Sequence, residues 1–332
     1  MTAASTAHRR RVGSLEVLLL GLIALAVSAG AVSAFVAGNA EFSTAATVFC
    51  GVFVQALPFL VLGVVVSGLI AAFVSAERLS RWLPRRPALA VLAAGIGGAA
   101  LPGCECGSVP VARRLFGPGV NGAAALTFML SAPAINPVVL VATAVAFPGR
   151  PDLVLARCVA SLLTAVVMGL LWSRFGRDEW VTRALPAPTA TTSSGRWTVF
   201  SEAARHDFLQ AASYLVVGAG AAAALHVLVP AWVFEHLAGN LLVGVITMAL
   251  LAVVLALCSE ADAFVVASLT MVPLAPRLVF LVVGPAFDVK LSAMQAGMFG
   301  RRFAVRFGPA TFLVATAVAT IVGLVILGGG AT

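Results

Sequence analysis

Apolar runs of the length that crosses a lipid bilayer recur along the whole sequence, and no other feature limits the fold as much. A helix needs about 20 apolar residues to cross the hydrocarbon core. Only 10% of the 332 residues are charged and 61% are hydrophobic, so this chain could not cover a core of its size with a polar surface. We therefore expect an all-α polytopic membrane protein, with full spans at residues 13–37, 45–74, 120–147, 153–174, 208–229, 278–298 and 309–328.

Two further apolar regions, residues 88–118 and 240–274, are interrupted near their middle by Gly, Pro, Cys and acidic residues. Neither half of either region is long enough to cross a bilayer alone. Backbone that is not helical at membrane depth is tolerated only where it is buried in protein or lines a wet cavity. We predict that both regions form re-entrant or broken helical hairpins whose tips line the functional site.

Basic residues lie between the apolar segments and predict the orientation of the chain. With the N-terminus inside, Arg9, Arg10, Arg11 and most of the other basic residues fall in cytoplasmic segments, as the positive-inside rule requires. The prediction is a multi-pass protein of the cell membrane, with its N-terminus and central linker in the cytoplasm. The net charge of +8 is spread over these loops and forms no basic domain, which argues against nucleic acid as a partner.

Three short motifs of the first half recur in the second half at a nearly constant spacing, which indicates a duplication. The matched pairs are Gln55 with Gln210, Cys104-Glu105 with Cys258-Ser259-Glu260, and Phe128–Asn136 with Phe280–Asp288. In the layout above, the two units cross in opposite directions, which predicts the inverted-repeat core of many secondary transporters. The expected parts are an N-terminal transmembrane helix at 1–44, a first repeat at 45–174, a cytoplasmic linker at 175–207 and a second, inverted repeat at 208–328.

The tip of the first interrupted region carries a carboxylate between two cysteines, Cys104, Glu105 and Cys106. Thiolates are soft ligands that suit Cu(I), Zn and other thiophilic centres. The helix that follows points its N-terminus at them, which favours a thiolate. Buried cysteines are also common as small apolar residues, so simple packing is the alternative explanation. We predict that all three side chains contact the substrate.

The second tip carries Cys258, Glu260 and Asp262, while Asp288 and Lys290 lie inside an expected span. A charge at the bilayer centre costs roughly 2.5 to 3.5 kcal/mol, so such groups usually face a cavity and mark an ion or proton path. Residues two apart on a helix do not share a face, so we expect Lys290 to pair with Asp262; mutual neutralisation of Asp288 and Lys290 is the alternative. We assign Cys258 and Glu260 to the substrate, and Asp262, Asp288 and Lys290 to ion coupling.

Asn136 takes the place of Asp288 in the first repeat, where its amide either caps a broken helix or contacts the substrate, and we include it among the expected substrate contacts. Gln55 and Gln210 are expected to bond helix to helix. The four histidines show no metal-ligand spacing, and the chain has no phosphate-binding loop. The sequence therefore predicts no cofactor, no definite metal site and no ATP-driven transport within this chain.

Four motifs in order along the chain resemble a known family. They are Pro102-x-Cys104-x-Cys106-Gly107-x-x-Pro110, Pro133-x-x-Asn136-Pro137, Cys258-Ser259-x-x-Asp262-Ala263-Phe264 and Gly284-Pro285-x-x-Asp288-x-Lys290. They are similar to the signatures of the predicted-permease family that includes the ArsP-type organoarsenical efflux permeases. The resemblance implies export of trivalent organoarsenicals in exchange for protons, with the cysteines as arsenic contacts. The family often has Ser where this chain has Glu105, and the added carboxylate favours a cation or proton at this tip.

The expected function is that of a permease and secondary transporter, and not of an enzyme. Three alternatives stay open: a transporter of a metal cation or other small solute through the carboxylates, a membrane thiol oxidoreductase that uses Cys104 and Cys106, and a channel or structural subunit. The expected partners are the lipid bilayer and a small-molecule or ion substrate, and a homo-oligomer is compatible with the sequence. The motifs do not specify the substrate, the direction, the coupling ion or the oligomeric state.

Overall fold

The computed structural model describes residues 38–73, 84, 86–100, 105–116, 122–181, 195–228, 241–270 and 272–328. All regular structure among these residues is helical, which confirms the all-α class. Contacts divide the chain into a short unit, Met1–Thr47, and a large unit, Val48–Thr332, to which every predicted site residue belongs. The expected first span at 13–37, the side chain of Cys104 and residues 182–194 of the expected linker lie outside the described residues.

The described helices form two sets that follow one another along the chain. The first set is α2 (Ala40–Phe73), α4 (Pro87–Gly98), α5 (Glu105–Leu115), α6 (Gly122–Ile135), α7 (Pro137–Ala146) and α8 (Pro151–Phe175). After the short 3₁₀ helix η1 (Asp178–Trp180), the second set is α9 (Arg196–Leu228), α11 (Leu241–Leu255), α12 (Ala261–Ser268), α13 (Leu274–Ala286), α14 (Val289–Met298) and α15 (Arg301–Ile326). Each set begins and ends with a long helix and has short helices between, so the lengths follow the repeat expected from the sequence. The opposite orientation of the two sets stays a prediction.

Four stretches of the described residues are long and apolar enough to cross a membrane: Phe42–Ile70, Gly122–Ala146, Pro151–Phe175 and Arg301–Ile326. They coincide with the predicted spans at 45–74, 120–147, 153–174 and 309–328. The helix α9 covers the predicted span at 208–229 but begins at Arg196, so residues 196–207 of the expected linker are helical. Both interrupted regions are broken, the first between α4 and α5 and the second between α11 and α12.

Two predicted spans are also broken, which corrects the layout expected from the sequence. The stretch at 120–147 is interrupted at Asn136, where α6 ends and α7 begins. The stretch at 278–298, expected as one span, consists of most of α13 and all of α14, separated by Phe287 and Asp288. Length and hydropathy do not reveal these breaks, because the residues on both sides of each are mostly apolar.

Helix caps explain both breaks. Asn136 has extended backbone, as the residue before a proline usually does, and its side-chain oxygen accepts a 3.0 Å hydrogen bond from the backbone N–H of Val139. Asp288 is the N-cap of α14, and its carboxylate accepts a hydrogen bond from the backbone N–H of Leu291. Because each side chain satisfies an N–H group of the new helix that has no partner within that helix, both breaks follow from the local sequence.

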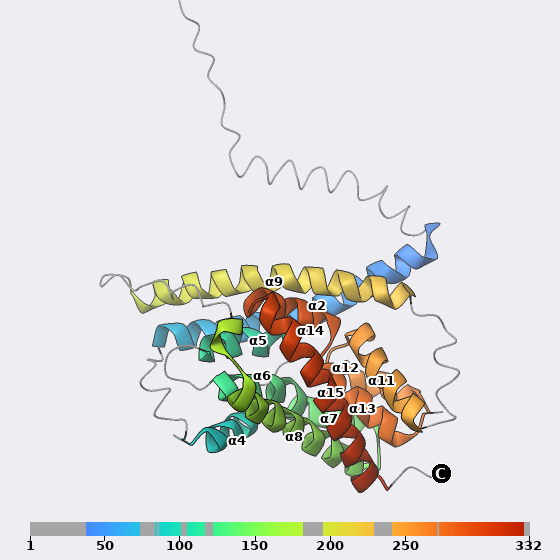
Figure 1. Ribbon diagram of the computed structural model, residues 1–332. Coiled ribbons are helices and arrows are strands. Elements are labelled where there is room, and N and C mark those ends of the chain that lie inside the picture. The colour runs from blue at the N-terminus through green and yellow to red at the C-terminus, as the bar shows by residue number, and fades with distance from the viewer. Residues whose placement is uncertain are drawn as a thin grey trace, which may run out of the picture. The chain divides into compact units, whose positions relative to one another are not determined.

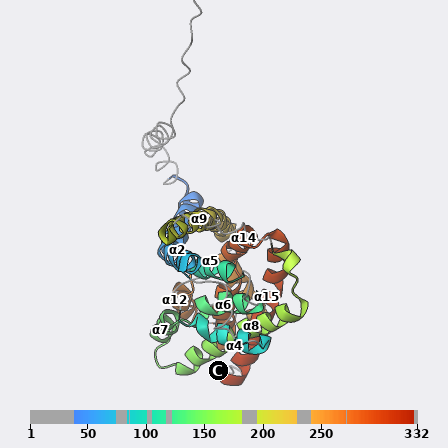
Figure 2. The same cartoon turned by 90° about the vertical axis from the view of Figure 1, so that its left-hand side faces the viewer.

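The long helices α2 and α9 lie side by side (Figure 1 and Figure 2). Glycines let both helices approach shorter ones closely. Gly63 of α2 faces the backbone of Gly107 in α5, and a Cβ atom on Gly218 of α9 would stand 2.7 Å from the Cα atom of Lys290 in α14. The long helices therefore hold α5 and α14, whose first turns carry several of the predicted site residues.

The core contains two buried apolar clusters, and each draws on both sets of helices. One combines residues of α2, α4, α5, α6 and α8 with residues of α9, α14 and α15. The other combines residues of α8 with residues of α11, α12, α13 and α15. Because neither cluster is confined to one set, the two sets pack against each other through both clusters, and Cys106 and Cys258 belong to the first of them.

Candidate functional site

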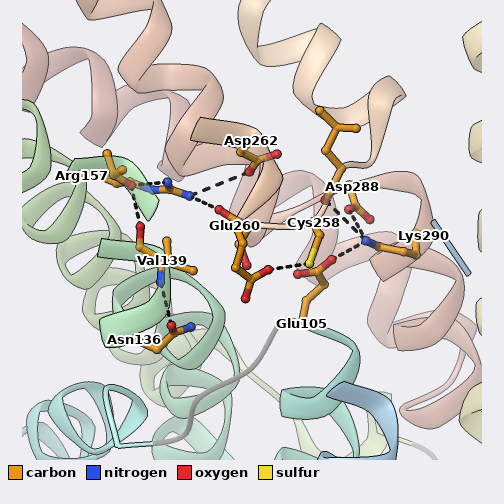
Figure 3. Close-up of polar contacts among 12 residues, drawn as sticks. Glu105, Asn136, Val139, Arg157, Cys258, Glu260, Asp262, Asp288 and Lys290 are labelled. Carbon is orange, nitrogen blue, oxygen red and sulfur yellow. Dashed lines mark hydrogen bonds and ion pairs between the residues drawn. The ribbon is translucent and has the colours of Figure 1, made fainter. Parts of the chain in front are cut away.

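The predicted site residues come mainly from the breaks between short helices, and most of them converge in one region (Figure 3). They are Glu105 at the start of α5, Cys258 and Glu260 in the break between α11 and α12, Asp262 in the first turn of α12, Asp288 before α14, and Lys290 in its first turn. Each of Glu105, Asp262, Asp288 and Lys290 is at most 1% exposed. The breaks therefore bring ionisable groups together in the core, where charged groups are costly without partners.

Lys290 joins the two sets of helices by its ammonium group. Its Nζ atom forms an ion pair with Oε1 of Glu105, lies 3.8 Å from Oδ2 of Asp288 and donates a long hydrogen bond of 3.5 Å to the carbonyl oxygen of Leu257. Figure 3 shows Glu105 and Lys290 approaching each other from different helices. The expected pairing of Lys290 with Asp262 is wrong, because Glu105 occupies Lys290 and Asp262 lies beside another cation.

That other cation is Arg157 of α8, for which no role was expected from the sequence. Its Nη2 atom lies 3.9 Å from Oδ2 of Asp262 and donates a 2.9 Å hydrogen bond to the carbonyl oxygen of Ser259. Its Nη1 atom donates a 2.7 Å hydrogen bond to the hydroxyl group of Thr143 in α7. The side chain is fully buried. One signal could have found it, because an arginine inside an apolar span is rare unless it is paired or functional.

Two buried thiols lie in this region, those of Cys106 and Cys258. The Sγ atom of Cys258 donates a 2.7 Å hydrogen bond to Oε2 of Glu260. Cys106 is the second residue of α5 and belongs to the same apolar cluster as Cys258. Both thiols are close enough to Lys290 to interact with its charge. The site therefore combines soft sulfur atoms with charged oxygen and nitrogen groups. Cys104, the third predicted thiol, lies outside the described residues.

The break between α11 and α12 has a tight backbone turn. Ala256 adopts a φ of 46°, a left-handed conformation that residues with a side chain rarely take. The N–H groups of Ala261 and Asp262 both donate to the carbonyl oxygen of Cys258, at 2.9 and 3.0 Å. This turn ends one helix and begins the next within a few residues, and it carries Cys258 and Glu260 on its tip.

Asn136 stands apart from the ion pairs (Figure 3). Besides capping α7, its Nδ2 atom donates a 3.0 Å hydrogen bond to the carbonyl oxygen of Ala132. Of the two roles left open by the sequence, the structure gives Asn136 that of a cap, and substrate contact stays a prediction. The predicted bond between helices is confirmed for Gln210, which donates to the carbonyl oxygen of Gly297 at 3.2 Å. The side chain of Gln55 lies outside the described residues.

The buried charges do not balance. Three carboxylates, those of Glu105, Asp262 and Asp288, share this region with two cations, Arg157 and Lys290, and all five side chains are almost completely buried. One negative charge is therefore left without a buried counter-ion. Taking an ion out of water costs several kcal/mol even in a relaxed protein site, so the imbalance favours binding of a proton or another cation.

Several buried polar atoms also have no hydrogen-bond partner among the described residues, and each costs about 1 to 3 kcal/mol if it stays unsatisfied. They include both oxygen atoms of Asp262, Oδ2 of Asp288, Nε of Arg157, Oε1 of Glu260 and the hydroxyl groups of Ser161 and Ser259. Such a concentration is unusual for a packed core. No group of three or more His, Cys, Asp or Glu side chains within the described ranges is arranged to hold a metal ion.

Known proteins are similar in sequence to this chain over most of its length. A family model described as a predicted permease matches residues 41–326. UPF0718 protein YcgR of Bacillus subtilis (strain 168) is 34% identical over 283 residues, which are 83% of this chain and 93% of YcgR. A protein of Streptococcus mutans serotype c (strain ATCC 700610 / UA159), named as a two-component membrane permease complex subunit, is 31% identical over 284 residues, which are 83% of this chain and 94% of that protein. No solved structure matches this chain.

The family match runs almost from the start of α2 to the end of α15 and includes every site residue described above. Apolar helices long enough to cross a bilayer and a polar centre inside the bundle agree with that match. The motifs around Cys106, Asn136, Asp262 and Lys290 indicate the same family. The chain therefore belongs to the predicted-permease family and is a membrane permease.

Proposed function

We propose that this permease is a secondary carrier that exports a small thiophilic solute, such as a trivalent organoarsenical, in exchange for protons. One observation carries the proposal: the two buried thiols of Cys106 and Cys258 share a region with more carboxylates than cations. The thiols offer contacts for a soft solute, and the excess carboxylate offers a site for a proton. Polar groups inside a membrane bundle are costly, and most of them line a transport path.

The thiol contacts support a soft substrate. A thiolate is the form of cysteine that binds soft centres, so the thiol must lose its proton when the solute binds. Glu260 is placed to accept that proton, because it already accepts the hydrogen bond of Cys258 at 2.7 Å. Solute binding at Cys258 then releases a proton to a carboxylate of the same site, which links the two transported species.

The charge imbalance supports exchange with protons. An unbalanced buried carboxylate is costly, and a proton removes its charge without adding volume. The ion pair between Glu105 and Lys290 joins α5 of the first set of helices to α14 of the second. A change of charge in this region therefore changes the attraction between the two sets. A carrier that moves one set against the other can expose such a centre to each side in turn.

A hard cation is a second candidate substrate. The oxygen atoms of Asp262 and Glu260 that have no hydrogen-bond partner among the described residues favour it, because oxygen ligands suit hard cations. The carboxylate of Glu105 adds to the negative charge of the site. The two candidates differ in which side chains hold the substrate, so one set of variants separates them.

Transport by the purified chain in proteoliposomes tests the proposal. The panel contains a trivalent methylarsenical, arsenite, Zn²⁺ and Na⁺, each with and without an imposed pH gradient. We expect saturable transport of the methylarsenical that increases with the pH gradient. Cys106→Ser and Cys258→Ser each raise the KM by about tenfold or more, since oxygen replaces the soft ligand. Glu105→Gln changes the pH dependence more than the KM, and Cys50→Ser, at an exposed position of α2, serves as the matched control.

Methylarsenical binding that survives combined serine replacement of Cys104, Cys106 and Cys258 would rule out the thiol contacts. A cation that is transported by that triple variant but not by Glu105→Gln or Glu260→Gln would favour the hard-cation candidate. Flux that does not saturate and ignores the pH gradient would point to a channel. Together these results distinguish a carrier of a soft solute, a carrier of a hard cation and a channel.

A further inference from the structure

The thiol chemistry proposed above does not involve Arg157 directly, but the side chain of Arg157 contacts three separate segments of the chain. Its guanidinium group reaches Thr143 of α7, the carbonyl oxygen of Ser259 in the α11–α12 break, and Asp262 of α12 (Figure 3). Glu260 directly follows Ser259, so a second carboxylate leaves the chain next to a carbonyl group that Arg157 binds. Arg157 therefore lies beside the carboxylate of Asp262 and binds the backbone next to a second acidic residue.

We propose that Arg157 is a positioning residue of proton coupling: it balances Asp262 while that carboxylate is ionised, and it balances Glu260 once Asp262 carries the coupling proton. The inference rests on the proton exchange proposed above and assigns that exchange to a site. In this step the incoming proton bonds to a carboxylate oxygen of Asp262, and the guanidinium group keeps its own protons. Only the counter-ion of Arg157 changes, from Asp262 to Glu260.

The surroundings of Asp262 suit a group that gains and loses a proton. Neither of its oxygen atoms has a hydrogen-bond partner among the described residues, so a proton can bind without displacing a donor. Gly284 of α13 lies against the carboxylate, and a Cβ atom there would stand 3.0 Å from Oδ2. This glycine leaves the room that the carboxylate occupies, which gives a physical reason for the Gly284-Pro285 motif.

Four charged groups act on Asp262. They are Arg157 of α8, Glu105 of α5, Asp288 before α14 and Lys290 in α14. Glu260, in the α11–α12 break, acts on Arg157. The neighbouring α7 carries no titratable side chain, and the single one of α13, Arg277, lies about two turns from Gly284. Lys290 is already paired with Glu105, so Arg157 is the cation in this set that can change partner.

The exchange of partners connects the proton to the substrate. When Arg157 turns to Glu260, the carboxylate of Glu260 gains a cation and becomes a weaker acceptor for the thiol of Cys258. The hydrogen bond between Cys258 and Glu260, 2.7 Å in this structure, is the contact that responds. Protonation of Asp262 thereby changes how readily Cys258 releases its proton to Glu260, and so how readily it binds a soft solute.

The test is the pH profile of gradient-driven transport of a trivalent methylarsenical in proteoliposomes. A neighbouring cation favours the ionised carboxylate, so Arg157→Gln lets Asp262 keep its proton to a higher pH and moves the midpoint upward by about one pH unit or more. Arg157→Lys retains the charge and moves the midpoint less. The matched control is Arg277→Gln, since Arg277 is also buried but donates to the carbonyl oxygen of Val272 and forms no ion pair among the described residues.

Glu260→Gln provides a second measurement with the opposite sign. It removes the carboxylate that competes for Arg157, so Arg157 pairs with Asp262 alone. The midpoint of the pH profile of transport then moves to lower pH. Should Arg157→Gln fail to fold, Arg157→Gln combined with Asp262→Asn removes both charges of the pair. This double variant is expected to fold and to lose the response of transport to the pH gradient, because the carboxylate that binds the coupling proton is gone.

A wild-type pH profile in folded Arg157→Gln, or an upward or absent shift in Glu260→Gln, would overturn the role of Arg157. If the wild-type chain transports the methylarsenical without responding to pH, proton coupling itself fails, and the role of Arg157 fails with it. If the wild-type profile depends on pH and only the variants fail to shift it, the proposed function stands and the inference alone falls.

Discussion

At the scale of single residues, two buried cations each lie opposite a carboxylate from a different part of the chain. Lys290 of α14 pairs with Glu105 of α5, and Arg157 of α8 lies beside Asp262 of α12. Removing one partner of such a pair leaves an uncompensated charge in the core, which typically costs about 3 to 5 kcal/mol. The two pairs therefore serve stability as well as any transport chemistry, and variants must separate these contributions.

Lys290→Ala leaves Glu105 and Asp288 without their shared cation, and we expect it to lower the free energy of unfolding by about 3 to 5 kcal/mol. Combining Lys290→Ala with Glu105→Gln removes one stranded charge and recovers a large part of the stability, while pH-driven transport stays lost. Thermal unfolding of the detergent-solubilised protein measures the first effect, and vesicle transport measures the second. Equal stability of the single and double variants would show that the pair is not energetically coupled.

At the scale of elements, the short helix α5 is positioned at both ends by polar contacts. Helix α5 begins at Glu105, which pairs with Lys290, and near its other end Arg114 forms two hydrogen bonds of 3.0 Å to the carboxylate of Asp207 in α9. Asp207 also accepts a 2.7 Å hydrogen bond from Ser67 of α2. A two-pronged arginine–carboxylate contact fixes direction as well as distance, so α5 is held in register with both long helices.

Gly218→Ala tests how α9 positions α14. The added methyl group would stand 2.7 Å from the Cα atom of Lys290, so backbone must move. We expect a loss of about 1 to 3 kcal/mol in stability, which is the usual cost of overpacking, together with reduced transport. Gly220→Ala in the same helix is the matched control, because no atom lies within 4 Å of its new methyl group; it is expected to stabilise the helix by about 0.5 to 1 kcal/mol. Equal effects of the two variants would contradict close packing at Gly218.

At the scale of the whole molecule, the two sets of helices share their core instead of forming separate domains. Long helices come first and last in each set, broken helices lie between them, and the ion pairs connect one set to the other. The internal duplication stays a prediction, and the orientation of the two sets across the bilayer is the part that a labelling experiment tests.

Cysteine labelling in a variant without native cysteines tests the predicted orientation. Gly195→Cys lies within the expected cytoplasmic linker, and Pro148→Cys lies in the turn between α7 and α8; both positions are exposed. We expect an impermeant thiol reagent to label Pro148→Cys from outside intact cells, and Gly195→Cys only after the membrane is opened, because the basic loops are predicted to stay inside. Labelling of both positions from the same side would reject the layout, since it places them on opposite sides.

The amino-acid sequence alone determined the membrane class, the family and most of the residues of the site. Apolar runs and the scarcity of charge require a bilayer, and the motifs around Cys106, Asp262 and Lys290 indicate the family. A charged residue inside an apolar run is visible without any structure. For this reason, Glu105, Asp288 and Lys290 could be selected in advance, and Arg157 could have been selected by the same rule.

Only the tertiary structure decided which of these groups meet. Partner choice depends on how helices far apart in sequence pack, so Lys290 pairs with Glu105 and Asp262 lies beside Arg157, against the expected pairing. The breaks at Asn136 and Asp288 depend on single capping residues within apolar stretches, which hydropathy averages away. Local patterns specify which side chains are apolar, charged or able to cap a helix, whereas the surplus of buried negative charge is a property of the packed core, because it exists only after distant segments have excluded water together.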